Sequence, residues 1–263
     1  MGSYIRKIID VGIVESVRII FRRLYRYSFK PYWYIYKLTT NDCVDVIPEA
    51  EKNDIEQRLQ KKEQSLQTLL LQNGAKRFLE IGIGESPNLR RMQLMKENKI
   101  AYTACDFESV CDNHRKALAL SGIDLQDIRF AGNRVGSYSW TLFEMLSRNE
   151  RFDIIYLDGH HTFYVDLPAF MLAHQLLEPG GYFLVDDIQW TLDFLRNTFL
   201  RSFNDWYFYR KIYNFAEYEA EQQKMPHMKM IVEQYLMKAF GYIKLDDYSM
   251  PEWWALQKPL KTE

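Results

Sequence analysis

The sequence predicts an α/β fold, a doubly wound sheet of seven mostly parallel strands with a helical N-terminal extension. Two observations support this prediction. Short apolar segments alternate with helical stretches of about ten to fifteen residues, which is the pattern of βαβ units. Gly82 and Gly84 follow the first such segment, where a strand turns into a helix. Together they indicate a Rossmann-like domain whose site lies at the carboxyl ends of the strands.

Three regions are expected along the chain. Residues 1–40 form a basic amphipathic segment, 41–74 a linker and leading helix, and 75–263 the Rossmann-like domain. Asp54 is expected to cap the leading helix, and Asn73-Gly74 to end it. The expected strands are 77–81, 100–105, 128–131, 152–157, 181–185, 206–213 and 253–257, and the last two are joined by a connection with helices at 217–224 and 228–240.

The N-terminal segment is strongly basic. Residues 4–38 carry eight basic and two acidic side chains, a net charge of +6. Their apolar residues recur at three- and four-residue steps, as on one face of a helix. Such a helix can pack on the domain, on a second subunit in a homo-oligomer, or on an anionic membrane surface, and the pattern leaves these open.

The charge and cysteine content restrict the expected partners and location. The whole chain has 35 acidic and 34 basic residues, so nucleic acid is not an expected partner. Its three cysteines, Cys43, Cys105 and Cys111, form no CxxC motif, and an odd number would leave one unpaired in an oxidising compartment. The sequence also lacks a signal-peptide pattern and an apolar stretch near the ~20 residues of a spanning helix. We expect a cytoplasmic protein, with peripheral contact at the inner membrane face if residues 4–38 bind lipid.

The glycine turn predicts a nucleoside-binding site. Glu80-Ile81-Gly82-Ile83-Gly84 leaves a strand, and Ser86 is expected to cap the next helix with Pro87 at its first position. Free amides at this helix start would face the carboxylate of a bound ligand. A dinucleotide turn would have a third glycine where Pro87 stands, which disfavours nicotinamide and flavin cofactors.

Two further residues extend this site along the strand ends. Asp106 ends the second expected strand, where a carboxylate can accept hydrogen bonds from both ribose hydroxyls. An acid at a helix start that only favours the helix dipole is the structural alternative. Asn133 follows the third strand and is expected either to meet an adenine edge or to form a turn.

Acids follow two further strands, which predicts a metal site. Asp158 ends one apolar strand, and Asp186 and Asp187 end the next. Neighbouring parallel strands would bring these carboxylates together, where a hard divalent cation such as Mg²⁺ would offset their repulsion. His161, three residues after Asp158, is the expected general base, because a neutral imidazole can take a proton from a polarised hydroxyl. His160 is expected to serve packing or a cap.

These motifs resemble those of class I S-adenosylmethionine-dependent methyltransferases, over about Ala75–Trp190. Glu80-x-Gly82-x-Gly84 resembles the family's motif for the methionine part of the cofactor, and Asp106 its ribose acid. Asp158-Gly159 with Asp186-Asp187 resembles the metal motifs of catechol and macrolide-sugar O-methyltransferases, and the run from Asp158 to Tyr164 an Asp-Gly-x-His-x-Tyr motif of bacterial methyltransferases. In the catechol enzymes a lysine base has the offset of His161. Ser86 departs from the pattern, because the family has a third glycine there.

The resemblance implies an S-adenosylmethionine-dependent O-methyltransferase that is assisted by a divalent cation such as Mg²⁺. Its expected acceptor is a hydroxyl of a sugar, glycolipid, polysaccharide or other small-molecule diol. Asp158 and His161 would be catalytic. Two other classes remain open. A metal-dependent hydroxylase on the same fold would use iron, although such enzymes favour two histidines and one carboxylate. A non-catalytic cofactor-binding protein would bind the cofactor without turnover.

Overall fold

The computed structural model describes residues 49–84, 86–134, 137–198, 215 and 217–260. The chain divides into two compact units, Met1–Ile55 and Glu56–Glu263, and the sheet belongs to the second. The expected amphipathic segment at residues 4–38 and the expected strand at 206–213 lie outside the described residues.

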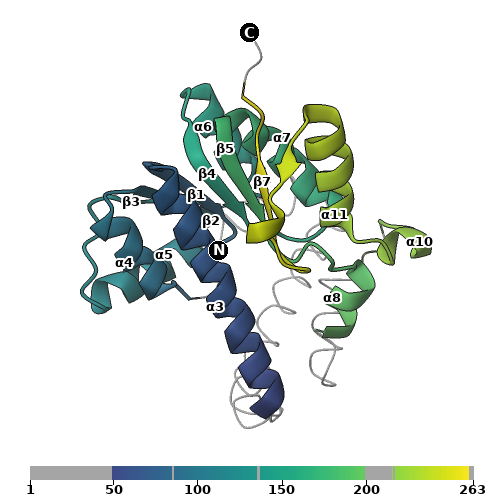
Figure 1. The fold of residues 1–263 in the computed structure, drawn as a ribbon, viewed down its shortest axis with the longest axis horizontal. Helices are drawn as coiled ribbons and strands as arrows, with labels where there is room; N and C mark the ends of the chain where they lie inside the picture. The colour runs from purple at the N-terminus through teal and green to yellow at the C-terminus, as the bar shows by residue number, and fades with distance from the viewer. Residues whose placement is uncertain (1–48, 85, 135–136, 199–214, 216, 261–263) are drawn as a thin grey trace, which may run out of the picture. The chain divides into compact units, whose positions relative to one another are not determined.

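Within the described residues, seven strands form one sheet in the order β3-β2-β1-β4-β5-β7-β6 (Figure 1). The first five in this order run parallel, β7 is antiparallel to β5, and β6 is antiparallel to β7. The predicted doubly wound, mostly parallel sheet is confirmed. The strands are β1 (Arg77–Ile81), β2 (Ala101–Phe107), β3 (Ile128–Asn133), β4 (Phe152–Leu157), β5 (Leu177–Val185), β6 (Ile243–Lys244) and β7 (Trp254–Gln257).

Helices cover both faces of the sheet, as continuous apolar strands require. One face packs against α3, α4 and α5 through residues such as Leu66, Met92 and Leu118. The other packs against α6, α7 and α11 through residues such as Leu142, Phe170 and Met228. The helices are α3 (Glu49–Gln72), α4 (Leu89–Glu97), α5 (Glu108–Leu120), α6 (Ser139–Ser147), α7 (Phe163–Leu176), α8 (Leu192–Thr198), α10 (Ala220–Gln223) and α11 (His227–Ile231), the last continuing into the π-helical segment η1 (Val232–Ala239).

Two local predictions were wrong. Helix α3 begins at Glu49, so Asp54 lies inside the helix rather than capping it. Asn88, not Ser86, caps α4, because its side-chain oxygen accepts from the Arg91 amide at 3.1 Å. The sequence did not predict β6, whose two residues are too short to show an alternating pattern. The predicted end of α3 is confirmed, with Gly74 in the left-handed region at φ 59°.

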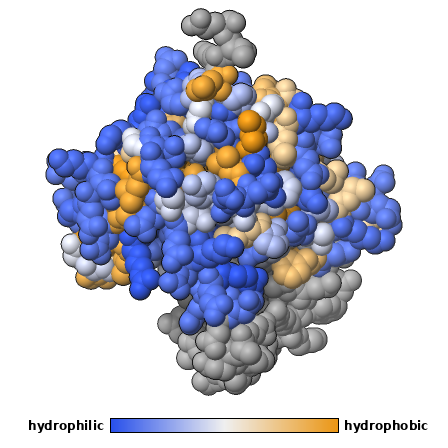
Figure 2. Space-filling model, viewed as in Figure 1, coloured by the Kyte–Doolittle hydropathy of each residue, from blue (hydrophilic) through white to orange (hydrophobic). Residues whose placement is uncertain are grey.

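Hydrophilic residues cover most of the face shown in Figure 2, and apolar residues occur there in separate patches. Among the described helices, none combines the length and the apolar character that crossing a membrane requires.

Candidate active site

The strand register brings the predicted site residues to one edge of the sheet. Ile81 pairs with Leu157, and Leu157 pairs with Val185, at the carboxyl ends of β1, β4 and β5. The ladder then continues by one residue, since the Asp158 amide donates to the Ile81 carbonyl at 2.9 Å and the Asp186 amide donates to the Leu157 carbonyl at 3.0 Å. The strand order reverses direction between β1 and β4, which is where open α/β sheets form their ligand crevice.

Gly82 is required where β1 meets β4. Its φ is 78°, and a Cβ atom there would lie 1.8 Å from the Asp158 carbonyl oxygen. No side chain fits at that approach, so glycine lets the β1 turn pass directly beside Asp158. The expected glycine turn and the expected metal acid therefore lie side by side.

A cavity of about 290 Å³ lies on the α3 side of this turn. Glu80 projects into it from β1 and is buried. One of its oxygens accepts from the Arg91 guanidinium at 2.5 Å and the other from the Tyr102 hydroxyl at 2.7 Å. Ser86 also lines the cavity, and so do Lys62 and Asp158. The cavity extends from the glycine turn to Asp158, the space that the methionine part of a nucleoside cofactor would need.

Asp106 fixes the glycine turn from β2. Its carboxylate accepts from the Ile83 amide at 2.9 Å and from the Phe107 amide at 2.6 Å. Each carboxylate oxygen has a second lone pair, so these bonds leave capacity for ribose hydroxyls. The structure thus places Asp106 at the turn, where its carboxylate binds the Ile83 backbone amide.

Asn133 ends β3 with a buried side chain whose Oδ1 atom has no hydrogen-bond partner among the described residues. A buried polar atom without a partner costs about 1–3 kcal/mol, so such an atom indicates a missing donor. The exocyclic amine of an adenine is a donor of the required kind.

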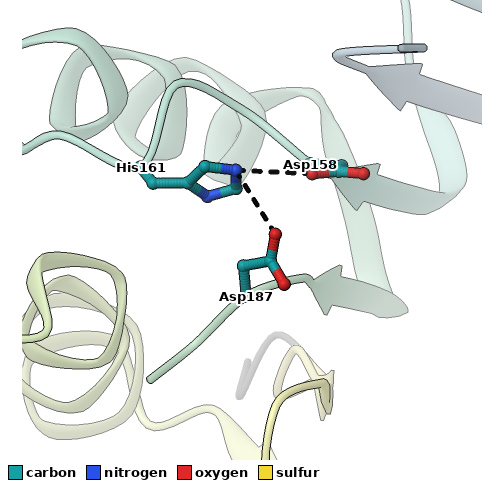
Figure 3. A group of neighbouring side chains, drawn as sticks. All are labelled: Asp158, His161 and Asp187. Atoms are coloured by element: carbon teal, nitrogen blue, oxygen red, sulfur yellow. Dashed lines mark ion pairs between the residues drawn. The ribbon is translucent and has the colours of Figure 1, made fainter. Parts of the chain in front are cut away.

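The structure brings Asp158, His161 and Asp187 together (Figure 3). One ligand atom from each lies within 4.8 Å of the other two. The His161 Nε2 atom lies 3.6 Å from an Asp158 oxygen and 3.5 Å from an Asp187 oxygen. Two carboxylates and an imidazole are suitable donors for a divalent cation. The residues present therefore fit the predicted metal.

The electrostatics of the group also favour a bound cation. Burial, followed by repulsion from Asp186, raises the pKa of Asp158 to about 7 and that of Asp187 to about 8. The Asp158 side chain remains 38% exposed, so solvent screens part of this repulsion. Burial lowers the pKa of His161 to about 4, which keeps the imidazole neutral near pH 7. A cation would stabilise both charged carboxylates and needs a neutral imidazole.

Two members of the group adopt backbone conformations that side chains disfavour. His161 has φ 62° and Asp187 has φ 49°, both in the left-handed region. Non-glycine residues persist there when surrounding contacts hold them, often at functional sites.

Asp186 lies apart from this group. Its Oδ2 atom accepts from the Lys62 ammonium of α3 and from the Tyr156 hydroxyl, and its Oδ1 atom accepts from the Asp187 amide at 3.0 Å. The three acids predicted to share one site therefore differ in their contacts. Asp186 pairs with Lys62, whereas Asp158 and Asp187 face His161.

Sequence reasoning missed several residues of the site. Lys62 and Arg91 come from helices that the motifs do not include, and no local pattern marks them. The Trp190 ring lies 5.0 Å from the His161 ring, just beyond Asp187. Asp166 holds the loop that carries His161, and its position four residues after Thr162, in the first turn of α7, is the one available signal.

The chain matches no protein-family model and no curated protein sequence. Solved structures resemble it at low identity. An O-methyltransferase family protein from Burkholderia thailandensis is 14% identical with a TM-score of 0.50, and the match covers 84% of this chain and 62% of that one. The O-methyltransferase from Bacillus cereus, solved with SAH, is 14% identical with a TM-score of 0.49, covering 89% and 90%. TomG, an O-methyltransferase from Streptomyces achromogenes solved with SAM, is 17% identical with a TM-score of 0.48, covering 77% and 80%.

The likeness to the Burkholderia protein establishes a shared fold. The resemblance to O-methyltransferases that the motifs predicted is thereby confirmed at the level of the fold.

Proposed function

We propose that this chain is an S-adenosylmethionine-dependent O-methyltransferase, assisted by a divalent cation, which acts on a hydroxyl of a small-molecule diol. The observation that carries the proposal is the group of Asp158, His161 and Asp187 beside the glycine turn. The fold shared with an O-methyltransferase family protein supports it.

The cofactor would lie along the ends of β1, β2 and β3. Gly82 and Gly84 let the backbone approach its methionine part, with Glu80 and Ser86 lining that end of the cavity. Asp106 would accept from the ribose hydroxyls, and the unpartnered Asn133 oxygen from the adenine amine. When bound, S-adenosylmethionine supplies the methyl group and the cation makes the acceptor hydroxyl more acidic.

Asp158 and Asp187 would hold the cation, with His161 as a third ligand. The predicted role of His161 as general base stays as the alternative. A base works best when its pKa lies near the working pH, and the lowered pKa of His161 makes it a weak proton acceptor. Its position between two carboxylates favours the ligand role. Asp186 would support the site through Lys62 and the Asp187 amide rather than bind the cation.

A cation held by Asp158, His161 and Asp187 can also bind one or two oxygens of the acceptor. This favours vicinal diols such as sugars, polysaccharide units or catechols. The Trp190 ring lies beside His161, and the Phe194 ring packs on Trp190 with their centroids 5.0 Å apart, so the two rings provide flat apolar faces on this side of the site. Such faces suit the ring of a sugar or an aromatic acceptor.

The first test combines cofactor binding with turnover. Calorimetry should show S-adenosylmethionine binding that persists in a chelator, and Asp106→Ala should weaken it by about 1.5–3 kcal/mol, the value of hydrogen bonds to a charged group. Transfer of a labelled methyl group to a panel of catechols and sugars should stop with chelator and return with Mg²⁺ or Mn²⁺.

The other outcomes separate the rival classes. Methyl transfer at the normal rate in chelator would refute the metal-assisted reaction. Cofactor binding without transfer to any acceptor in a broad panel would indicate a non-catalytic binding protein. Turnover that needs iron and 2-oxoglutarate would indicate a hydroxylase.

A further inference from the structure

Asp166 lies outside the candidate cation group but is fully buried beneath it, on the first turn of α7. One oxygen accepts from the Thr162 amide at 2.7 Å. The other accepts from the His160 amide at 3.2 Å and from the Tyr138 hydroxyl. The carboxylate therefore binds the backbone on both sides of His161.

The same carboxylate also limits the start of this loop. A Cβ atom on Gly159 would lie 2.3 Å from an Asp166 oxygen and 2.5 Å from the Tyr138 hydroxyl. Gly159 thus packs directly on Asp166, between Asp158 and His160. Of the three residues between Asp158 and Thr162, Gly159 packs on the Asp166 side chain and His160 donates its amide to it. His161 lies between His160 and Thr162, whose amides Asp166 both binds.

These contacts explain how His161 keeps its unfavourable conformation. A histidine at φ 62° needs surroundings that enforce it, because a side chain in the left-handed region clashes with its own backbone. Fixing the amides of His160 and Thr162 leaves the intervening residue little freedom. The imidazole then faces the oxygens of Asp158 and Asp187.

We propose that Asp166 is a positioning residue, which holds the turn from Asp158 to Thr162 so that Asp158 and His161 present their ligand atoms to one cation. The inference rests on the proposed function of that site. A plain helix cap would also accept the Thr162 amide, but it would not need the His160 amide, the Tyr138 hydroxyl or the close packing of Gly159.

The test measures Mn²⁺ affinity by calorimetry on the full chain. Asp166→Asn keeps the shape but cannot accept all three hydrogen bonds, and it should weaken Mn²⁺ binding by about 10–100-fold, the usual cost of losing a group that orients metal ligands. Tyr138→Phe, which keeps the carboxylate and removes one donor, should cause a smaller loss. S-adenosylmethionine affinity should stay near the wild-type value in both.

Asp153→Asn is the matched control. The Asp153 carboxylate also accepts from two backbone amides, those of Lys76 and Arg77 at 2.8 Å each, but near the start of β4, at the opposite edge of the sheet. It should lower thermal stability without changing Mn²⁺ affinity. If Asp166→Asn and Tyr138→Phe bind Mn²⁺ like the wild type, Asp166 is only a cap and the proposal is overturned. If Asp166→Asn does not fold, Tyr138→Phe decides the result.

A failure of the proposed function looks different. In that case the wild type itself binds no Mn²⁺, and the positioning role is judged from the ring ¹⁵N signals of His161, assigned by their loss in His161→Gln. Signals that shift in Tyr138→Phe and Asp166→Asn but not in Asp153→Asn support the positioning role. Signals that stay unchanged in all three variants overturn it.

Discussion

At the scale of single residues, Asp186 and Asp187 are adjacent in the chain but have opposite surroundings. Asp186 is 8% exposed at its side chain and pairs with Lys62, which is 16% exposed. Asp187 instead faces His161. The difference follows from the left-handed backbone of Asp187, which turns the chain away from the strand. Sequence showed two acids at a strand end but could not show this turn.

The buried pair predicts a strong effect of removing one partner. Lys62→Met should lower the free energy of unfolding by about 3–5 kcal/mol, because it leaves the Asp186 carboxylate buried beside Tyr156 without the lysine ammonium that balances its charge. Urea unfolding of Lys62→Met, Asp186→Asn and the double variant measures this. The double variant should lose less than the sum of the single losses, since neither partner is left alone. Additive losses would show that the pair is not coupled.

The donor set of the candidate cation group predicts a metal preference. An imidazole nitrogen suits transition metals better than Mg²⁺, so the wild type should bind Mn²⁺ more tightly than Mg²⁺. His161→Gln should weaken Mn²⁺ binding on the order of tenfold and Mg²⁺ binding less, as competition calorimetry would show. Asp187→Asn serves as the control that should weaken both. An unchanged Mn²⁺ preference in His161→Gln would return the imidazole to the predicted role of general base.

At the scale of elements, the sequence predicted the central strands best. The expected bounds of β1 and β4 agree with the structure, because most residues of each strand are apolar and buried, and a turn or an acid follows. Strand β5 begins four residues earlier than expected, since Pro179, Gly180 and Gly181 suggest a turn but lie within the strand. Long-range pairing decides these ends, and local patterns do not report it.

Helix α7 carries a histidine whose environment predicts a pH effect. Burial, and then repulsion from Lys258, lowers the pKa of His174 to about 4. Its ring lies 4.0 Å from the Phe240 ring and its Nδ1 atom lies 3.0 Å from the Tyr242 hydroxyl. Because the unfolded chain binds a proton near pH 6.5 and the folded protein does not, folding stability should fall as the pH drops from about 6.5 towards 4.

Thermal unfolding, measured at pH values between 7.5 and 5 that are about half a unit apart, would test this effect. His174→Gln keeps a polar group near Tyr242 but cannot titrate, so its melting temperature should fall less steeply than that of the wild type as the pH drops. Burial also lowers the pKa of His161 and of His227, and these contributions remain in the variant. Parallel pH curves for the two proteins would show that His174 does not contribute.

At the scale of the whole molecule, the site forms from segments that are distant in sequence. The Lys62 and Asp186 partners are 124 residues apart, and the Ile83 and Asp106 partners are 23 apart. The βαβ pattern and the glycine turn predicted a site at the carboxyl ends of the strands. They did not predict the strand order that puts this site between β1 and β4. The sequence also did not predict which helix residues line the site, because α3 and α4 reach it through packing rather than through a motif.

The basic N-terminal segment leads to the last prediction, which rests on sequence alone, because residues 4–38 lie outside the described residues. With a net charge of +6, the segment should bring the full chain to vesicles that contain anionic lipid and not to neutral ones. Replacing Arg22, Arg23 and Arg26 with glutamine should weaken co-sedimentation roughly 100-fold, since each basic residue near such a surface contributes about 1 kcal/mol. The alternative is a contact with a partner subunit. Vesicle binding that is equal for both proteins, together with a change of oligomeric state in the variant, would favour the subunit contact over lipid.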